Sequence, residues 1–251
     1  MKVAITGGKG FIGSHLPKSW KRIEKDVRYL ALDDLVSFDV VVHLAALTNV
    51  EESFRCPATY FDSNVIGTWN LISRAINVGT VKKIVFTSSV GCKYNITMSP
   101  YTFTKFIGEE LCKYRLNSID TIILRLHNVY GNGCRGVVSN FVESKKEGKM
   151  AYIEGSGLQT RDFIYIEDVV KAIKYAIKRG KSGEIYEIGT GKEVTILELA
   201  NMVGVIYGYK EGRINEITNV KADINNTTKD LEWKPKIKLE NGIKKMLECK
   251  K

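Results

Sequence analysis

The sequence has no paired arrangement of cysteines and no long hydrophobic run. Its five cysteines are an odd number, widely spread and without a CxxC pair, so we expect no disulfide framework, no metal site and a reducing compartment. No stretch approaches the roughly 18 apolar residues of a membrane-spanning helix. Met1 and Lys2 lead directly into an apolar segment, which leaves no space for a signal peptide. Together these absences predict a cytoplasmic protein without a membrane partner.

The charge balance is strongly basic, yet the sequence has no nucleic-acid-binding signature. Its 38 lysines and arginines against 28 acidic residues give a net charge of +10, which favours anionic partners. The basic residues are dispersed, and zinc-finger spacing, a basic zipper and an aromatic RNA-binding motif are missing. We therefore expect a phosphate-bearing small molecule rather than nucleic acid as the partner. A hydrophobic content of 44% also excludes a disordered chain.

Short apolar runs alternate with longer amphipathic segments in the first half of the chain. The runs are rich in β-branched residues, as expected for strands that are covered on both faces, and they lie at 3–5, 40–42, 84–86 and 122–124. Segments 63–77 and 101–116 between them have helical periodicity. This alternation predicts an α/β fold with a doubly wound parallel sheet, which binds ligands at the carboxyl ends of its strands.

A glycine-rich turn follows the first apolar run. Residues 6–13, with the sequence TGGKGFIG, connect that strand to the start of a helix. Glycine is needed where the turn is tight and where backbone N–H groups approach a pyrophosphate, and Gly13 lets the helix pack closely on the strand. Because the turn follows a strand and opens a helix, it predicts a dinucleotide-binding site.

Tyr101 and Lys105 are four positions apart and so share one face of the predicted helix. A nearby lysine ammonium favours the phenolate and lowers the tyrosine pKa from about 10 towards that of a useful general base. Ser89 lies at the carboxyl end of the third apolar run, where its hydroxyl can hold the substrate alcohol that the phenolate deprotonates. An amphipathic surface pair is the alternative interpretation of the tyrosine and lysine alone. With the glycine turn and the serine in order, the pair indicates a catalytic site.

With these motifs the sequence resembles the extended short-chain dehydrogenase/reductase family, in particular its nucleotide-sugar epimerases and dehydratases. Further motifs along nearly the whole chain carry the resemblance: HLAA at 43–46, NVIGT at 64–68, LRLHNVYG at 124–131, QTRDF at 159–163, EIGTG at 187–191 and WKP at 233–235. The resemblance implies a Rossmann domain that binds NAD in residues 1–130, to which later segments such as 160–190 return. It also implies a smaller substrate-binding region in residues 131–251.

The resemblance assigns roles to particular residues. Ser89, Tyr101 and Lys105 match the catalytic triad, with Tyr101 as the base. The residues implied in cofactor binding are Gly7, Gly10, Phe11, Ile12, Gly13, Asp33, Leu44, Ala45, Ala46, Asn64, Tyr101 and Lys105. The residues implied in binding a nucleotide-diphosphate sugar, with UDP as the expected nucleotide, are Ser89, Tyr101, Asn128, Arg161 and Arg213. The two arginines are suited to clamp the diphosphate, although a surface ion pair is the alternative for either. A homodimer formed by the helices at 63–77 and 101–116 is also implied.

The residues after Ser89 bear on the reaction. They are Val90, Gly91 and Cys92, without a carboxylate, whereas dehydratases and decarboxylases of the resembled family carry acid/base carboxylates here. A 4-epimerase needs only the tyrosine base, bound NAD and space for the keto sugar to turn. We therefore expect NAD-dependent inversion at C4 of a nucleotide-diphosphate sugar through a 4-keto intermediate. Two alternatives stay open: an NADPH-dependent 4-keto-sugar reductase or epimerase that uses Cys92, and a nucleotide-sugar binding protein without turnover.

The region between the glycine turn and the HLAA motif is short. Pro17 interrupts the first expected helix, and only about one strand fits where members of the resembled family have two strands and two helices. Asp33 is either the carboxylate that binds the adenosine ribose or the aspartate of the following strand, which meets the adenine. We favour the second assignment, because Asp33 leads directly into 38–43. It implies that the adenosine-ribose strand is missing and that Asp33 does not distinguish NAD from NADP.

Overall fold

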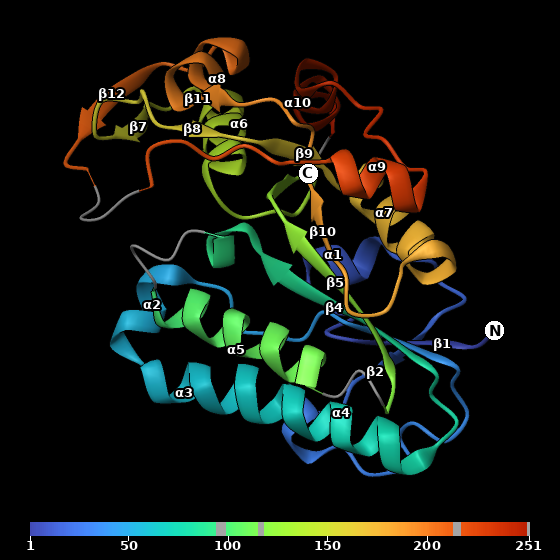
Figure 1. Ribbon diagram of the computed structural model, residues 1–251. Helices are drawn as coiled ribbons and strands as arrows, with labels where there is room; N and C mark the ends of the chain where they lie inside the picture. Colours follow the sequence, from blue (N-terminus) through green and yellow to red (C-terminus); the bar gives the residue numbers. More distant parts are fainter. Residues whose placement is uncertain (94–98, 115–117, 213–216, 250–251) are drawn as a thin grey trace.

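A parallel six-stranded sheet forms the centre of the larger part of the molecule (Figure 1). The computed structural model describes residues 1–93, 99–114, 118–212 and 217–249. The strand order is β10-β5-β4-β3-β1-β2, and every neighbouring pair is parallel. The strands are β1 (Val3–Thr6), β2 (Lys21–Ile23), β3 (Val40–His43), β4 (Lys83–Ser89), β5 (Asp120–Leu126) and β10 (Ile185–Ile188). This order and direction confirm the predicted doubly wound α/β fold.

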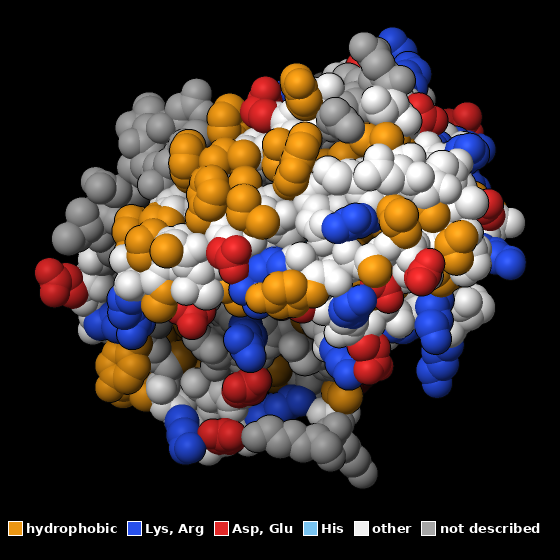
Figure 2. All heavy atoms as spheres, turned by 90° about the horizontal axis from the view of Figure 1, so that it is seen from below, with side chains coloured by type: hydrophobic (Ala, Val, Ile, Leu, Met, Phe, Trp, Pro, Cys, Tyr) orange, Lys and Arg blue, Asp and Glu red, His pale blue; other side chains and the backbone are white. Residues whose placement is uncertain are grey.

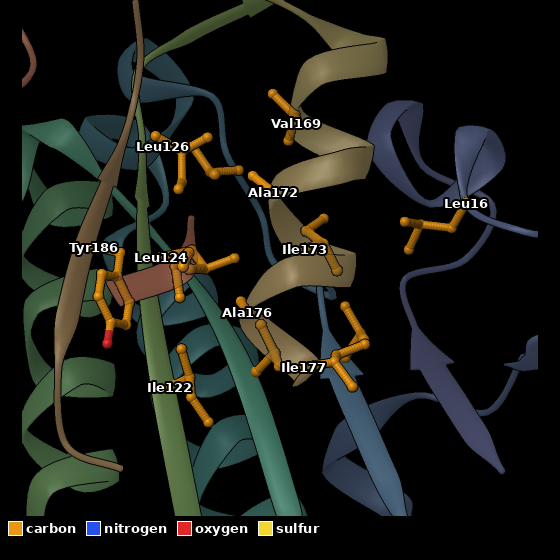
Figure 3. Close-up of a cluster of buried hydrophobic side chains, with 14 of the residues drawn as sticks. Leu16, Ile122, Leu124, Leu126, Val169, Ala172, Ile173, Ala176, Ile177 and Tyr186 are labelled. Atoms are coloured by element: carbon orange, nitrogen blue, oxygen red, sulfur yellow. The ribbon is translucent and has the colours of Figure 1, made fainter. Parts of the chain in front are cut away.

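Helices cover both faces of this sheet, which explains why its central strands are apolar throughout. One face carries α1 (Phe11–His15) and α7 (Ile166–Arg179); the other carries α4 (Gly67–Val78), α5 (Pro100–Tyr114) and the 3-10 helix η1 (Val27–Tyr29). Figure 3 shows α7 packed on β5, with Ala172 and Ile173 facing Leu124. The buried residues of α7 repeat at intervals of three and four, which is the pattern of a helix with one apolar face.

The connection between β1 and β3 contains a strand that the sequence analysis did not expect. β2 lies beside β1 at the edge of the sheet, with Arg22 opposite Ile5, so the prediction that the strand next to β1 is missing is wrong. β2 has only three residues, and two of them are charged, so it has no apolar pattern in the sequence. A strand at the edge of a sheet does not need such a pattern. Between β2 and β3 the structure has only η1. A strand–helix unit is therefore missing there, as predicted.

Arg22 stabilises the short helix α1. The helix ends at His15, two residues before Pro17, and its last carbonyl groups have no partner within the helix. The Arg22 guanidinium donates hydrogen bonds to the carbonyl oxygens of Leu16 at 2.8 Å, Pro17 at 2.7 Å and Trp20 at 2.8 Å. One side chain thus holds the turn from α1 into β2 in place of a longer helix.

The helix expected at 63–77 begins with a turn of π-helix. The chain from β3 continues through α2 (Val50–Arg55), α3 (Pro57–Phe61), the π-helix η2 (Asp62–Ile66) and then α4. Asn64 lies in the π-turn and is buried. Wider turns of this kind occur mostly at functional sites.

A smaller region lies above the carboxyl ends of the strands in Figure 1. It contains three two-stranded sheets: β6 (Asn128–Tyr130) with β9 (Phe163–Tyr165), β7 (Ala151–Glu154) with β12 (Tyr207–Lys210), and β8 (Thr160–Arg161) with β11 (Val194–Thr195). Its helices are α6 (Val137–Glu147), α8 (Ile196–Val203) and α10 (Leu239–Glu248), while α9 (Asn225–Leu231) packs against α7. Phe141, Ile153 and Leu199 are central in its separate core. No helix of the described segments is long and apolar enough to cross a membrane.

Candidate active site

A cavity of about 440 Å³ lies at the carboxyl ends of β1, β3, β4 and β5. It brings together most residues that the sequence analysis assigned to the site: Gly7, Gly10, Phe11, Ile12, Gly13, Leu44, Ala46, Ser89, Tyr101, Lys105 and Asn128. These residues come from distant parts of the chain, and they meet because parallel strands all end at one edge of the sheet. Among the described residues that line the cavity there is no aspartate or glutamate.

The glycine turn forms a closely packed cradle at one end of this cavity. Gly7 has a φ of +70°, and a Cβ atom there would lie 2.6 Å from the backbone nitrogen of Ala45. A Cβ on Gly13 would lie 2.5 Å from the carbonyl oxygen of Gly7, so the helix can approach the strand only with glycine. Gly10 is exposed and lines the cavity, where its bare backbone admits a pyrophosphate. The turn therefore fits a dinucleotide such as NAD.

Tyr101 and Lys105 face the cavity from α5, but their protonation differs from the sequence-based expectation. Burial raises the pKa of Tyr101 to about 12, against the opposing effect of a hydrogen bond with the Ser89 hydroxyl. Burial also lowers the pKa of Lys105 to about 8. The Lys105 ammonium donates a hydrogen bond to the carbonyl oxygen of Thr87 at 2.7 Å. The expected lowering of the tyrosine pKa is therefore not found, because burial disfavours the charged phenolate.

Glu109 lies one further turn along the same face of α5 and is fully buried. Its carboxylate accepts hydrogen bonds from the Ser88 hydroxyl at 2.5 Å and from Nε and Nη2 of Arg125 at 2.8 and 2.7 Å. The two-pronged contact with Arg125 compensates the buried charge. Because Ser88 is on β4 and Arg125 on β5, this contact fixes α5 against the strand that carries Ser89.

His43 is the last residue of β3 and is buried next to the site. Its Nδ1 and Nε2 atoms lie 2.7 Å from the Thr6 hydroxyl and 3.0 Å from the Thr68 hydroxyl. Burial, with a contribution from the Lys105 charge, lowers the pKa of His43 to about 3. The imidazole is therefore neutral, and it joins β1, β3 and α4 beneath the cavity.

A second cavity of about 270 Å³ continues from the first. The two share Asn128, Gly136 and Val137, and the second is lined by Arg161. The Arg161 guanidinium donates hydrogen bonds to the carbonyl oxygens of Thr160 at 2.7 Å and Ile217 at 2.8 Å. Arg213, the other predicted diphosphate ligand, lies outside the described residues. The structure thus places Asn128 where the two cavities meet and Arg161 beyond it.

Three residues assigned to cofactor binding do not line either cavity. Ala45 packs behind Gly7. The buried Asn64 side chain accepts a hydrogen bond from the Leu47 N–H at 2.8 Å and donates to the Leu47 carbonyl oxygen and the Thr104 hydroxyl, both at 3.0 Å. It therefore holds the loop after β3 against α5. Asp33 is exposed in a turn that leads to the amino end of β3. The structure therefore does not bring Asp33 to the site.

Two charged residues at the site were missed by the sequence analysis. Glu24 directly follows β2 at its carboxyl end, and its carboxylate lies 3.1 Å from the Lys9 ammonium of the glycine turn. An acid about 20 residues after such a turn is the available signal, but the short strand before Glu24 concealed it. Arg135 lines the main cavity; it is one basic residue in a glycine-rich segment, and no sequence motif marks it.

Cys92 does not line the cavity. Its thiol lies 3.3 Å from the Ser88 hydroxyl and 3.7 Å from the carbonyl oxygen of Thr102. Burial raises the pKa of the Cys92 thiol, which opposes formation of a thiolate. The surroundings of Cys92 are those of a packed core residue.

A nucleotide-binding glycine turn and a Ser–Tyr–Lys group in one cavity of a doubly wound sheet define a dinucleotide-dependent enzyme of the short-chain dehydrogenase/reductase type. Comparison with known families agrees: residues 29–189 match the model of the NAD dependent epimerase/dehydratase family. The chain belongs to this family, and the expectation of NAD as the cofactor is confirmed.

Individual relatives resemble the chain over almost its full length. A Methanocaldococcus jannaschii protein assigned as a UDP-glucose 4-epimerase is 34% identical, with 99% of this chain and 98% of the relative covered. That alignment spans 304 positions, more than the 251 residues of this chain, so the relative has internal segments that this chain lacks. The UDP-glucose 4-epimerase of Thermotoga maritima, solved with UDP-glucose, has a TM-score of 0.88 at 28% identity and covers 99% and 98% of the two chains.

Other similar proteins are solved with a different sugar nucleotide or are named for different activities. The protein MoeE5, solved with UDP-glucuronic acid and NAD, has a TM-score of 0.90 at 27% identity, with 99% and 98% of the chains covered. Similar proteins also include dTDP-D-glucose 4,6-dehydratases and a UDP-N-acetyl-alpha-D-glucosaminuronate decarboxylase. Membership of the family therefore establishes an enzyme class with several reactions.

Proposed function

We propose that the protein inverts C4 of a nucleotide-diphosphate sugar through a transient 4-keto sugar. The observation that carries this proposal is the composition of the main cavity, which joins Ser89, Tyr101 and Lys105 to the glycine turn. Its described lining includes the Tyr101 hydroxyl as the proposed proton acceptor and no carboxylate. This is the minimum set for removing and returning a hydrogen at one carbon.

In this mechanism the Tyr101 oxygen takes the proton of the sugar 4-hydroxyl and later returns it. The Ser89 hydroxyl bonds the same sugar oxygen and the Tyr101 phenol, and it orients both. The Tyr101 phenol first releases its own proton to solvent, and the Lys105 cation stabilises the resulting phenolate, which is the form that takes the sugar proton. NAD held at the glycine turn would supply the hydride-acceptor chemistry at C4, and a turn of the keto sugar within the cavity would expose its opposite face to the returning hydrogen.

The same cavity disfavours the other reactions of the family. Elimination of water needs an additional acid and base, and residues 90–108 contain neither aspartate nor glutamate. A reductase that uses Cys92 is disfavoured because its thiol is bonded to Ser88 and Thr102, away from the cavity lining. Epimerisation at C4 requires neither group.

The proposed substrate is UDP-linked, and the smaller region, 131–251 apart from segments such as 160–190, holds it. Asn128 at the junction of the two cavities contacts the diphosphate in this arrangement, and Arg161 provides positive charge on its nucleotide side. Two of the similar proteins described above are solved with UDP-sugars. We further propose that Glu24 bonds the adenosine ribose hydroxyls of NAD, since it stands at the carboxyl end of the strand beside β1.

We also propose a homodimer through the face formed by α2, α3, α4 and α5. Figure 2 looks onto this side of the molecule, where hydrophobic side chains gather. The exposed fraction is 62% for Phe54 and 47% for Phe103, and Phe61 and Trp69 are also exposed. An apolar groove between α2, α3 and α5 is lined by Phe54, Phe61 and Phe103. A second copy of the same face covers these side chains in a two-fold arrangement.

The direct test is incubation of the purified protein and NAD with UDP-glucose, UDP-galactose and their N-acetyl forms. We expect the C4 epimer of at least one of them, identified by proton NMR. Tyr101→Phe should abolish turnover and leave UDP-sugar binding by calorimetry intact, because only the acidic hydroxyl is lost. Tyr114→Phe, on the exposed face of the same helix, is the matched control and should keep full activity. Absence of any epimer, or full activity of Tyr101→Phe, would contradict the proposal.

A further inference from the structure

Arg135 stands in a segment that the backbone turns towards the main cavity. The segment joins β6 to α6 and contains Gly131, Gly133 and Gly136, whose φ angles are +154°, +84° and +106°. Cys134 is buried in the core of the smaller region and anchors the segment. The next side chain, Arg135, is exposed and lines the cavity. The fold thus presents a second cation, besides Lys105, to the cavity that Tyr101 lines.

The Arg135 guanidinium has no ion-pair or hydrogen-bond partner within the described part of the chain. Most arginines of the structure have one: Arg28 pairs with Asp26 and Asp62, and Arg125 pairs with Glu109. The cavity lining in the described residues contains no acidic side chain that could neutralise Arg135. An anionic group of a ligand in this cavity therefore meets a cation and no like charge.

The position of Arg135 relative to the two cavities indicates which part of the substrate it meets. Arg135 lines the main cavity, with Ser89 and Tyr101, and not the second one. Arg161 lines the second cavity and not the main one. A nucleotide sugar that spans both cavities has its reacting sugar ring beside Tyr101 and its nucleotide beside Arg161. Arg135 is therefore at the sugar end, beyond Asn128.

We propose that Arg135 binds a carboxylate on the sugar ring and that the preferred substrate class is a nucleotide-diphosphate hexuronate. This inference rests on the proposed 4-epimerase function. The planar guanidinium donates two parallel hydrogen bonds to a carboxylate, which a neutral hydroxymethyl group cannot match. Arg135 is exposed and has no partner among the described residues, and a C6 carboxylate gives it a partner of opposite charge.

The test compares UDP-glucuronate with UDP-glucose, which differ only in the C6 group. For the wild-type protein we expect a higher kcat/KM with UDP-glucuronate. Arg135→Leu should lower kcat/KM for UDP-glucuronate by roughly 10- to 100-fold, as expected for loss of a charged hydrogen bond, and change that for UDP-glucose less than about 3-fold. Arg135→Lys should restore part of the preference. Lys174→Leu removes an exposed cation from α7 and should change neither value.

The outcomes separate this inference from the proposed function. Turnover of UDP-glucose without a preference for UDP-glucuronate overturns the role of Arg135 and leaves the epimerase standing. Equal losses for both sugars in Arg135→Leu make Arg135 a diphosphate ligand and also overturn it. If neither sugar is turned over, the proposed epimerase function is refuted. The carboxylate site is then tested by measuring the binding of both sugars by calorimetry. Tighter binding of UDP-glucuronate that Arg135→Leu abolishes supports the carboxylate site, and equal binding of both sugars refutes it.

Discussion

Burial determines the protonation of the ionisable side chains around the cavity. It raises the pKa of Tyr101 and lowers those of Lys105 and His43, in each case because the charged form loses hydration. The Glu109 carboxylate pairs with Arg125 and accepts a hydrogen bond from Ser88. The site therefore combines the neutral Tyr101 and His43 with the cationic Lys105, and the Glu109–Arg125 ion pair fixes α5 against the sheet.

His43 should make the stability of the protein depend on pH. Its pKa is about 3 in the folded state and about 6.5 in the unfolded chain, so the unfolded state binds more protons between these values and stability falls as the pH decreases. Between pH 7.5 and 5.0 the loss from this residue is about 2 kcal/mol. Urea denaturation of the wild type and His43→Gln at both pH values measures it. The variant should lose about 2 kcal/mol less over this interval, and an equal loss in both proteins would refute the assignment.

At the scale of elements, the shortened connection between β1 and β3 is the most unusual part of the fold. β2 has three residues, α1 has five, and Arg22 joins them through backbone carbonyl groups. The connection nevertheless brings Glu24 opposite Lys9 of the glycine turn. With the proposed role of Glu24, NAD binding at the adenosine end depends on an edge strand of three residues.

Glu24 and Asp33 give opposite predictions for NAD binding. Glu24→Gln should lower the affinity for NAD by roughly 10- to 100-fold, because a charged acceptor for the ribose hydroxyls is lost. It should also raise the affinity for NADP relative to that for NAD. Asp33→Asn is the control and should bind NAD like the wild type, since Asp33 lies in an exposed turn away from the cavity. Both affinities follow from nucleotide titration by calorimetry. The reverse ranking would assign the ribose contact to Asp33.

At the scale of the whole molecule, two cores meet at the site. The sheet and its helices form one set of buried clusters, and the smaller region has its own. The cavity lies between them, with the glycine turn, Ser89 and Tyr101 on the sheet side and Arg135 on the other. Residues on α5 link this site to the proposed dimer face, since Tyr101 faces the cavity while Phe103 faces outward.

Phe103→Glu should convert the proposed dimer into monomers. Phe103 is 47% exposed, so its burial in the dimer contributes about half of the roughly 1.5–3 kcal/mol of a fully buried Phe. Because it occurs twice in a two-fold interface, the dissociation constant should rise at least about 10-fold. Sedimentation velocity over a concentration series measures this change. Tyr209→Glu, an exposed aromatic on β12, is the control and should sediment like the wild type. A monomeric wild-type protein would contradict the interface.

Much of the fold and of the site was predictable from local patterns. The glycine turn, Ser89, and the spacing of Tyr101 and Lys105 each require only one short segment and a known position after a strand. β2 was not predictable, because a three-residue edge strand with two charges has no apolar signature. Glu24 was missed with it. Arg135 and Glu109 were missed because their roles depend on which distant residues they face, which periodicity does not encode.

The sequence by itself determined the class of fold, the cofactor site and the order of the catalytic residues, since these follow from the alternation of strands with helices and from local backbone requirements. Only the tertiary structure decided that a strand lies beside β1, that Asp33 lies away from the cavity and that Arg135 and Tyr101 line the same cavity. The physical reason is that these facts depend on packing and desolvation, which arise only when separate segments of the chain come together. Burial also decided that the Tyr101 pKa rises rather than falls.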